Sequence, residues 1–508
     1  MTDADGANVL FVVLDTVRKD RLTVYGHDEP TTPHLAEFAR EARVYEQAVA
    51  PAPWTLPVHA SLFTGLYPSE HGATQENPYL EGATTLAESL SAAGYDTACY
   101  SSNAWITPYT NLTAGFDDQD NFFQIMPGDL LSGPLSRAWK AMNDNPRLRG
   151  VADRLVQMGN WFHERFAAGE GGDTKTPAVI DRTIDFVDDS EQFFAFINLM
   201  DAHLPYHPPE EYAEQFAPGV DSTEVCQNSK EFNSGARDID EGEWDDIRGL
   251  YDAEIAHMDA QLDRLFTHLR ETGQWEDTMV VVCADHGELH GEHDLYGHEF
   301  CIYDPLVNVP LLVKHPRVDA GRDEETTVEL VDLYHTVLDA TGATATDGGR
   351  PLAAARSLLS GEHRALDPLA APDDGDPIDR SGVGFVEYHR PVVELRQLEA
   401  KASSAGIALE EDSRFYARMG AARAPDAKYV HNTTIPDEAY RLDRDPGETE
   451  NLAGSDDERI AAMERALEAF VDDVDATWTG TGGPGDEDVL DDMGEEAKDR
   501  LQDLGYME

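Results

Sequence analysis

The chain contains four apolar runs that each end in a polar side chain. Most of them are rich in Val, Ile or Phe, as buried strands are. The runs and their last residues are NVLFVVLD (8–15, Asp15), TACYSSN (97–103, Asn103), FFAFINLMD (193–201, Asp201) and MVVVCAD (279–285, Asp285). Helix-like segments separate them, which favours an α/β fold with a mostly parallel sheet. Because the carboxyl ends of parallel strands lie at one edge, we expect these four side chains to meet there.

Three aspartates at one sheet edge favour a metal site. An Asp after a strand is also a common cap or turn residue, and for any single Asp that interpretation is the stronger one. Unpaired carboxylates that lie together repel each other, however, and a divalent cation removes the repulsion. In ADHGELHGEHDLYGH (284–298), His286 follows the strand directly and is the expected ligand beside Asp285. His298 is placed to reach a substrate oxygen, and the two histidines between them are interpreted as loop residues.

The stretch PWTLPVHASLFTG (53–65) places a hydroxyl, a proline and an imidazole on the predicted first turns of a helix. Thr55 can serve as an N-cap, and Pro57 is tolerated in a first turn. The free amides of such a helix bind tetrahedral anions, and His59 shares a face with Thr55. We therefore expect the Thr55 hydroxyl, near a dication, to attack phosphorus or sulfur. The alternative is that Thr55 only caps the helix and that His59 lies on its surface.

Acidic residues are spread along the whole chain. Asp and Glu number 99 against 38 Lys and Arg, a net charge of −61, while 41% of residues are hydrophobic. An acidic tail would concentrate the charge, so we interpret it as a halophilic surface of the kind found in acidic archaeal proteomes. This charge excludes a basic nucleic-acid groove. With no signal peptide, no membrane span and no disulfide framework in the sequence, we expect a soluble, cytoplasmic protein.

Ordered motifs along the chain resemble one known family, the sulfatase-like branch of the alkaline phosphatase superfamily. The resemblance runs from about residue 8 to 455. It rests on LDTVRKDRLTVYGH (14–27), TTPHLAEFAREARVYEQAVAPAPWTLPVHASLFTGLYPSEHG (31–72), MDAHLPYHPP (200–209), ADHGELHGEHDLYGH (284–298), YDPLVNVPLLVKHP (303–316) and YRLDRDPGETENLAG (440–454).

The resemblance implies an alkaline-phosphatase-like α/β/α sandwich with a central, mostly parallel sheet and a smaller C-terminal subdomain with an antiparallel sheet. We expect that second sheet to use strands at 383–388, 414–418, 427–432 and 439–443. The expected organisation is a catalytic domain at 1–345 with insertions near 128–175 and 218–247, an α+β subdomain at 346–478, and an acidic linker with a C-terminal helix at 479–508.

The resemblance also implies roles for individual residues. Asp15, Asp285 and His286 occupy positions of metal ligands, and Thr55 occupies the nucleophile position beside the ion. His203 and His298 are expected to contact the ester group, and His59 to assist them. Asn103 falls where many sulfatases carry a substrate-binding Lys, and Asp201 is a further candidate for substrate binding.

The chain departs from the sulfatase pattern at the nucleophile. Typical sulfatases convert a Cys or Ser in Cys/Ser-x-Pro-x-Arg to formylglycine, but this chain has Thr55-Leu56-Pro57-Val58-His59. Thr cannot give that aldehyde, so no formylglycine is expected. Thr is the nucleophile in phosphodiesterases and phosphoethanolamine transferases of the superfamily. The loss of the Arg weakens stabilisation of a dianionic group, so a monoanionic ester is the easier substrate.

The function predicted from these features is a metal-dependent, sulfatase-like hydrolase that cleaves a sulfate or phosphate ester through Thr55. The alternatives are a phosphodiesterase or phosphonate monoester hydrolase, and a headgroup transferase of the same superfamily. The expected cofactor is one divalent ion, Mn²⁺, Zn²⁺, Ca²⁺ or Mg²⁺. The expected partner is a small-molecule, glycan or lipid ester and not a nucleic acid. The sequence carries no signal for an oligomeric state.

Overall fold

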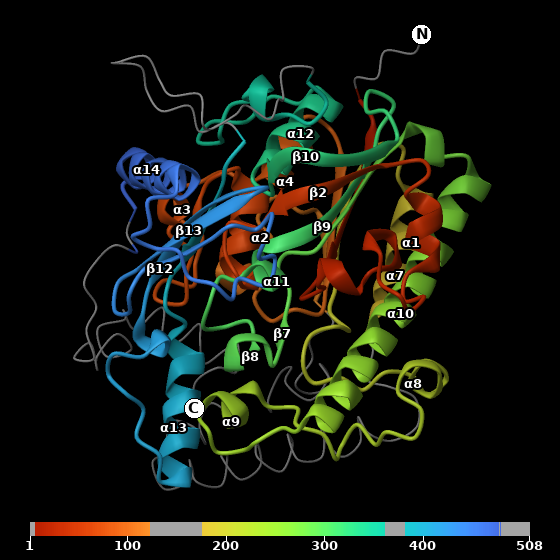
Figure 1. The fold of residues 1–508 in the computed structure, drawn as a ribbon. Helices are drawn as coiled ribbons and strands as arrows, with labels where there is room; N and C mark the ends of the chain where they lie inside the picture. Colours follow the sequence, from red (N-terminus) through yellow and green to blue (C-terminus); the bar gives the residue numbers. More distant parts are fainter. Residues whose placement is uncertain (1–5, 122–174, 361–381, 477, 479–508) are drawn as a thin grey trace, which may run out of the picture.

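An eight-stranded sheet forms the centre of the computed structural model, which describes residues 6–121, 175–360, 382–476 and 478 (Figure 1). All but one of its strands run in the same direction, and the exception is β9, which is antiparallel to both of its neighbours. The strands in spatial order are β10 (Gly321–Glu329), β2 (Arg43–Val49), β9 (Asn308–Lys314), β6 (Thr278–Cys283), β1 (Asn8–Leu14), β5 (Phe193–Leu199), β3 (Asp96–Ser101) and β4 (Asp118–Asn121). The predicted, mostly parallel sheet is therefore confirmed.

Helices cover both faces of this sheet. On one side α10 packs against α1 and α7, and on the other α2 packs against α4 and α12 (Figure 1). The bounds are α1 (Pro33–Phe38), α2 (Thr55–Thr64), α4 (Leu86–Ala92), α7 (Thr176–Asp189), α10 (Glu241–Thr272) and α12 (Asp332–Thr341). Because both faces are covered, the central strands are apolar throughout instead of alternating. This explains why the four runs were recognisable in the sequence.

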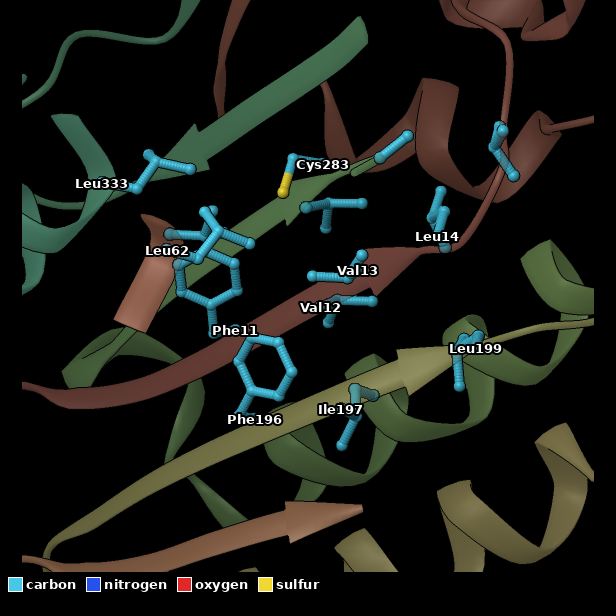
Figure 2. Packing of buried hydrophobic residues seen from close by; sticks show 14 of the residues in the cluster. Phe11, Val12, Val13, Leu14, Leu62, Phe196, Ile197, Leu199, Cys283 and Leu333 are labelled. Carbon is cyan, nitrogen blue, oxygen red and sulfur yellow. The ribbon is translucent and has the colours of Figure 1, made fainter. Parts of the chain in front are cut away.

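Aromatic and branched side chains fill the space between the sheet and its helices. Phe11 on β1 and Phe196 on β5 lie side by side, with ring centroids 5.3 Å apart. Leu62 of α2 and Leu333 of α12 pack over the same face (Figure 2). The burial of this core fixes the register of β1 between β5 and β6, and so determines which residues follow the strand ends.

A second, antiparallel sheet lies beside the central one, as predicted. It consists of β11 (Gly384–Tyr388), β12 (Met419–Ala424), β13 (Ala427–Asn432) and β14 (Glu438–Tyr440), with α14 (Glu458–Val474) packed on β12 and β13. A backbone hydrogen bond joins β11 to the chain that follows β2: the amide of Glu387 donates to the carbonyl of Pro51 at 2.8 Å.

One strand of the second sheet was predicted in the wrong place. Residues 414–418 were expected to form it, but Arg414–Tyr416 form a 3-10 turn and the strand begins at Met419. The sequence of β12, MGAARA, lacks the β-branched and aromatic residues that mark a strand. Tertiary packing overrides this propensity, because the small side chains leave room for the buried ring of Trp478.

The remaining elements are short, apart from the 14-residue helix α13. They are α3 (Pro68–His71), α8 (Glu210–Phe216), α9 (Ser229–Asn233), α11 (Asp304–Val307), α13 (Val392–Ala405), β7 (Leu289–His290) and β8 (Tyr296–Gly297). The expected insertion at 218–247 contains α9 and the start of α10. The expected insertion at 128–175 and the expected helix at 479–508 lie outside the described residues, apart from Lys175. Within the described ranges, no helix is both long enough and apolar enough to span a lipid bilayer.

Buried charges connect the second sheet to the loop after the central strands. The Lys428 ammonium on β13 is fully buried and donates to the Ile302 carbonyl at 2.6 Å. It also contacts Asp304 at 3.1 Å and Glu448 at 2.8 Å. Arg423 on β12 binds the same Asp304 carboxylate at 2.8 Å. Each of these charges is paired, as burial requires.

We predict that Gly420→Ala lowers the stability of the protein. A Cβ atom at this position would lie 2.0 Å from a ring carbon of Trp478. Such overpacking costs about 1–3 kcal/mol of the free energy of unfolding, and the melting temperature measured by circular dichroism should fall. Gly447→Ala is the matched control, because the nearest atom to its Cβ is 3.7 Å away. Equal melting temperatures for the two variants would contradict the tight packing of β12 on Trp478.

Candidate functional site

The ends of β1 and β6 bring two carboxylates and an imidazole together. The two strands pair in parallel with Val13 opposite Cys283, so Asp15 and Asp285 stand at equivalent positions beyond the strand ends. Asp15, Asp285 and His286 each offer one ligand atom, and these atoms lie within 4.8 Å of one another. All three residues are fully buried. The three predicted metal ligands therefore converge as expected from the parallel strands.

Hydrogen bonds hold the Asp15 carboxylate in place. Its Oδ2 accepts from the side-chain amides of Asn103 at 2.8 Å and Asn198 at 3.0 Å. Its Oδ1 accepts from the Thr16 hydroxyl at 2.8 Å. Asn198 was missed by the sequence analysis, although an amide inside the apolar run FFAFINLMD was a signal for a polar role. Asn103, proposed for substrate binding, thus also orients a carboxylate.

Thr16 holds Asp285 at the expense of backbone strain. Its φ of 64° is unusual for a β-branched residue. In this conformation its amide donates to Asp285 Oδ1 at 3.0 Å, and the amide of His286 donates to the same oxygen at 2.9 Å. Strain of this kind persists where the surroundings fix it and is common at functional sites.

The other oxygen of Asp285 is buried without a hydrogen-bond partner among the described residues. Burial, followed by repulsion from Asp15, raises the pKa of Asp285 well above its usual value. Burial also opposes ionisation of Asp15, but His203 and His286 outweigh it and lower the pKa of Asp15. An unpaired carboxylate oxygen, a second carboxylate and an imidazole form a donor set that suits a divalent cation. The residues present therefore fit the metal that the sequence predicts.

The ring of His286 is oriented for coordination through one nitrogen. Its Nδ1 lies 3.0 Å from the carbonyl of Gly287, so this nitrogen carries the proton and donates it there. Its Nε2 is left to accept, and lies 3.5 Å from the Thr55 hydroxyl. Gly287 is required next to it, because a Cβ there would lie 2.0 Å from the Pro305 carbonyl oxygen.

Thr55 is the first residue of α2 and does not cap it. Trp54 occupies the N-cap position, and no side-chain hydrogen bond caps the helix. The Thr55 hydroxyl instead accepts from Asn103 Nδ2 at 3.3 Å and faces His286 Nε2. The alternative that Thr55 is a plain cap is therefore wrong, and its hydroxyl points toward the carboxylate cluster.

His59 lies one turn further along α2 and is fully buried, not on the helix surface. Its Nδ1 lies 2.9 Å from the Thr55 carbonyl and 3.7 Å from Asp285 Oδ2. Burial lowers the pKa of His59, although Asp15 and its hydrogen bonds oppose this effect. The ring thus supports the backbone of Thr55 and the carboxylates from inside the fold.

Two further histidines lie next to the cluster. The ring of His298 lies against that of His286, with centroids 4.4 Å apart and the planes tilted by 38°, and the ring centroid of His203 lies 5.4 Å from that of His298. His298 Nδ1 contacts the fully buried carboxylate of Glu288 at 3.1 Å. Burial alone would lower the pKa of His298. Glu288 and Glu299 outweigh this effect and raise the pKa to about 9. The role of Glu288 was not predicted, since its position in ADHGE gave no hint of its partner.

Asp201 is the predicted site residue that the cluster does not include. It follows β5, but its carboxylate pairs with His257 Nδ1 of α10 at 2.9 Å. His203, two residues on, reaches the histidine group instead, and its Nδ1 contacts the Leu204 carbonyl at 2.7 Å. The sheet edge therefore brings together Asp15, Asp285, His286, Thr55, Asn103 and, through the His286 ring, His298 and His203.

Comparisons with known proteins agree with this architecture. The family profile described as Sulfatase matches residues 7–343. Multifunctional alkaline phosphatase superfamily protein PehA of Trinickia caryophylli is 28% identical, over 90% of this chain and 93% of that protein. The phosphonate monoester hydrolase of Agrobacterium radiobacter superposes with a TM-score of 0.63 at 20% identity, covering 92% of this chain and 95% of its own. A 2-O GAG sulfatase superposes with a TM-score of 0.63 at 16% identity, covering 96% of both chains.

The sheet, its flanking helices and the second antiparallel sheet are the fold shared with these two structures, and the Sulfatase profile places the chain among the hydrolases of the alkaline phosphatase superfamily. The profile match covers more than half of the chain. Within that superfamily, the chain therefore belongs to the sulfatase family. The resemblance carried by the sequence motifs is thereby confirmed.

We predict opposite effects of Asp285→Asn with and without metal. Without metal, the amide removes a buried charge next to Asp15 and should raise the free energy of unfolding by about 1–2 kcal/mol. With metal, the loss of a ligand should weaken binding by about 100-fold or more. Melting temperatures in EDTA and in 1 mM MnCl₂ would measure both effects.

Asp201→Asn is the control for this experiment, because Asp201 pairs with His257 outside the cluster. It should leave the rise in melting temperature on adding Mn²⁺ unchanged. A metal response that survives in Asp285→Asn and disappears in Asp201→Asn would place the ion elsewhere.

Proposed function

We propose that this sulfatase-family protein is a divalent-metal-dependent hydrolase that cleaves a sulfate or phosphate ester with Thr55 as the nucleophile. The observation that supports it best is the direction of the Thr55 hydroxyl. It leaves the helix end uncapped and instead lies between His286 and Asn103, beside two buried carboxylates. A plain structural threonine at a helix start would bond to the backbone amides of the first turn.

The proposed metal ligands are Asp15, Asp285 and His286, with Thr55 beside them. A bound Mn²⁺, Zn²⁺, Mg²⁺ or Ca²⁺ would lower the pKa of a nearby hydroxyl and offset negative charge on the ester group. The protein's own contribution is to hold the ligand atoms within 4.8 Å of one another before any ion arrives. The Nδ1–H of His286 is directed to the Gly287 carbonyl, which leaves its Nε2 available.

The proposed reaction begins with attack by Thr55 Oγ1 on sulfur or phosphorus. A new bond forms between this oxygen and the central atom, the hydroxyl proton passes to water, and the bond to the leaving oxygen breaks. The first-turn amides of α2, which no side chain caps, are the proposed donors to the non-bridging oxygens. Asn103 Nδ2 keeps its bonds to Asp15 and to the attacking oxygen. Water then cleaves the Thr55 ester and restores the hydroxyl. Transfer to an acceptor alcohol instead of water would make the protein a transferase.

His298 is the proposed proton donor to the leaving oxygen, with His203 beside it. Its Nδ1 is engaged by Glu288, so the Nε2 edge of the ring is free to face the ester. The negative Glu288 carboxylate favours the protonated imidazole, which is the form that can donate. His59 supports the nucleophile by holding the Thr55 carbonyl. Unlike the arginine of the sulfatase motif, it provides no fixed positive charge to stabilise a dianionic ester group.

A monoanionic ester group fits this site better than a dianionic one. Sulfate monoesters, phosphonate monoesters and phosphodiesters all carry one charge at the reacting group. Thr55 cannot form the formylglycine that sulfatases use, and this supports the phosphonate or phosphodiester alternatives. The shared fold with a phosphonate monoester hydrolase is consistent with the phosphonate alternative.

The first test is an activity panel with purified protein in molar KCl, with Mn²⁺, Zn²⁺, Mg²⁺ or Ca²⁺ added separately. The substrates are 4-nitrophenyl sulfate, 4-nitrophenyl phenylphosphonate, 4-nitrophenyl phosphate and bis(4-nitrophenyl) phosphate. Thr55→Ala should lower kcat by about 10⁴-fold or more, and Thr55→Ser should retain activity. EDTA should abolish it.

The preferred substrate decides between the candidate reactions. Faster cleavage of the diester or phosphonate than of the sulfate would assign a phosphorus ester as substrate. Faster sulfate release that needs Thr55 would assign a sulfatase that works without formylglycine. Activity that persists in Thr55→Ala would contradict the proposed nucleophile.

We predict that Glu288→Gln lowers kcat by about 10–100-fold with little change in KM. Without the carboxylate the pKa of His298 falls, so a smaller fraction of the ring is protonated and able to donate to the leaving oxygen. The loss should therefore be larger for phenyl esters than for 4-nitrophenyl esters, whose leaving group needs less protonation. A loss of equal size for both leaving groups would mean that Glu288 serves only the packing of this region.

A further inference from the structure

Arg390 is a buried arginine without an acidic partner. Its side chain is 4% exposed. The other buried arginines, Arg18, Arg423 and Arg459, pair with Asp20, Asp304 and Asp426 at 2.6–2.8 Å. Within the described residues, by contrast, Arg390 makes no hydrogen bond and no ion pair. This is unexpected in a chain with 99 Asp and Glu residues.

The guanidinium of Arg390 keeps its charge at any working pH. Its stem is buried, but none of its nitrogens is among the buried side-chain atoms that lack a hydrogen-bond partner, so the guanidinium end of the side chain reaches solvent. Glu394 accepts from Gln75, and Glu299 pairs with Lys230, so neither carboxylate is paired with Arg390. An anion that arrives from solvent would therefore meet an unpaired guanidinium.

The link that carries Arg390 lies next to the candidate site. It joins β11, which ends at Tyr388, to α13, which begins at Val392 (Figure 1). The Tyr388 hydroxyl donates to the carbonyl of Glu299 at 2.5 Å, and Glu299 directly follows His298. Two residues of chain span at most about 7 Å, so the Cα of Arg390 lies within about 7 Å of the Cα of Tyr388, the residue whose hydroxyl makes this contact.

The opposite side of the link contacts the segment that follows α2 and α3. The amide of Val393 donates to Gln75 Oε1 at 3.0 Å. Behind that segment, His71 Nε2 lies 3.2 Å from the carbonyl of Pro57, in the first turn of the helix that begins at Thr55. The link that carries Arg390 therefore contacts both the segment that follows α2 and α3 and the segment that follows His298.

We propose that Arg390 binds a second anionic group of the substrate, separate from the ester that is cleaved. The planar guanidinium forms paired hydrogen bonds with carboxylate, sulfate or phosphate oxygens, and the substrate class is an ester that also bears such an acid group. This inference rests on the proposed function, since it places the acid group on the molecule that Thr55 attacks. It makes Arg390 a residue for specificity, not for the chemical step.

Matched aryl esters test this inference. The phenyl, 3-carboxyphenyl and 4-carboxyphenyl esters of the acid that the wild-type protein cleaves fastest differ by one carboxylate. The wild-type protein should show a kcat/KM at least about 10-fold higher for one carboxylated ester than for the phenyl ester. Arg390→Gln should remove this preference and change kcat/KM for the phenyl ester by less than about threefold. Arg390→Lys keeps the positive charge but not the paired N–H donors of the guanidinium. Its preference for the carboxylated ester should therefore lie between that of the wild-type protein and that of Arg390→Gln.

Arg396→Gln is the matched control. It removes one positive charge from the exposed side of α13, four residues after Val392, and should leave the preference unchanged. Circular dichroism melting curves of all variants check that they fold. Equal loss on the phenyl and carboxyphenyl esters in Arg390→Gln would overturn the proposal, and so would a wild-type protein without any preference.

A binding experiment separates this inference from the proposed function. Calorimetric titration of 4-sulfobenzoate, which carries two acid groups, needs no turnover. Weaker binding to Arg390→Gln than to the wild-type protein, by about 10-fold or more, would support the anion site even if no ester were cleaved. Equal binding to both proteins would overturn it. Inorganic sulfate that binds as tightly as 4-sulfobenzoate would assign Arg390 to a free anion and overturn the substrate subsite.

Discussion

Two buried carboxylates that repel each other determine the architecture of this site. Asp15 and Asp285 follow adjacent parallel strands in matched register, so they cannot move apart without disrupting the sheet. The surrounding chain accommodates them with amide donors from Asn103 and Asn198 and with the strained backbone of Thr16. These groups donate hydrogen bonds to every oxygen of the two carboxylates except Asp285 Oδ2, and that oxygen faces His59 and His286. The polar network thus leaves a single direction from which a cation can complete it.

The parallel strand ends and the helix N-terminus perform different tasks at the same edge. The strand ends supply negative charge, whereas α2 presents a hydroxyl at its positive end. His59 links the two, because it contacts both the Thr55 carbonyl and the Asp285 side of the cluster. In the sulfatase pattern this position carries an arginine. A ring with a lowered pKa in its place keeps the interior contacts but removes a fixed positive charge.

The parts of the fold and site that were predictable are those written into local sequence. Asp15, Asp285 and His286 follow apolar runs directly, and parallel pairing makes their meeting a consequence of topology. Asn198 and Glu288 were not predicted, because their roles depend on which side chains face them across the fold. Asp201 has the same local signal as Asp15, yet it pairs with His257 on α10. The strand at Met419–Ala424 was misplaced because Trp478, far along the chain, stabilises a segment with low strand propensity.

The buried ion pairs of Lys428 and Arg423 limit which parts of this protein could be exchanged during evolution. Asp304 is the first residue of α11, which follows the histidine-rich segment, and its carboxylate is neutralised by Lys428 and Arg423 of the second sheet. Removing that sheet would leave the negative charge of Asp304 unpaired in the interior, near the end of β6. The two sheets are therefore not interchangeable modules: recombination that replaced one would have to supply matching charges at this junction. Single substitutions at this junction are constrained in the same way, because each must leave the opposite charge with a partner.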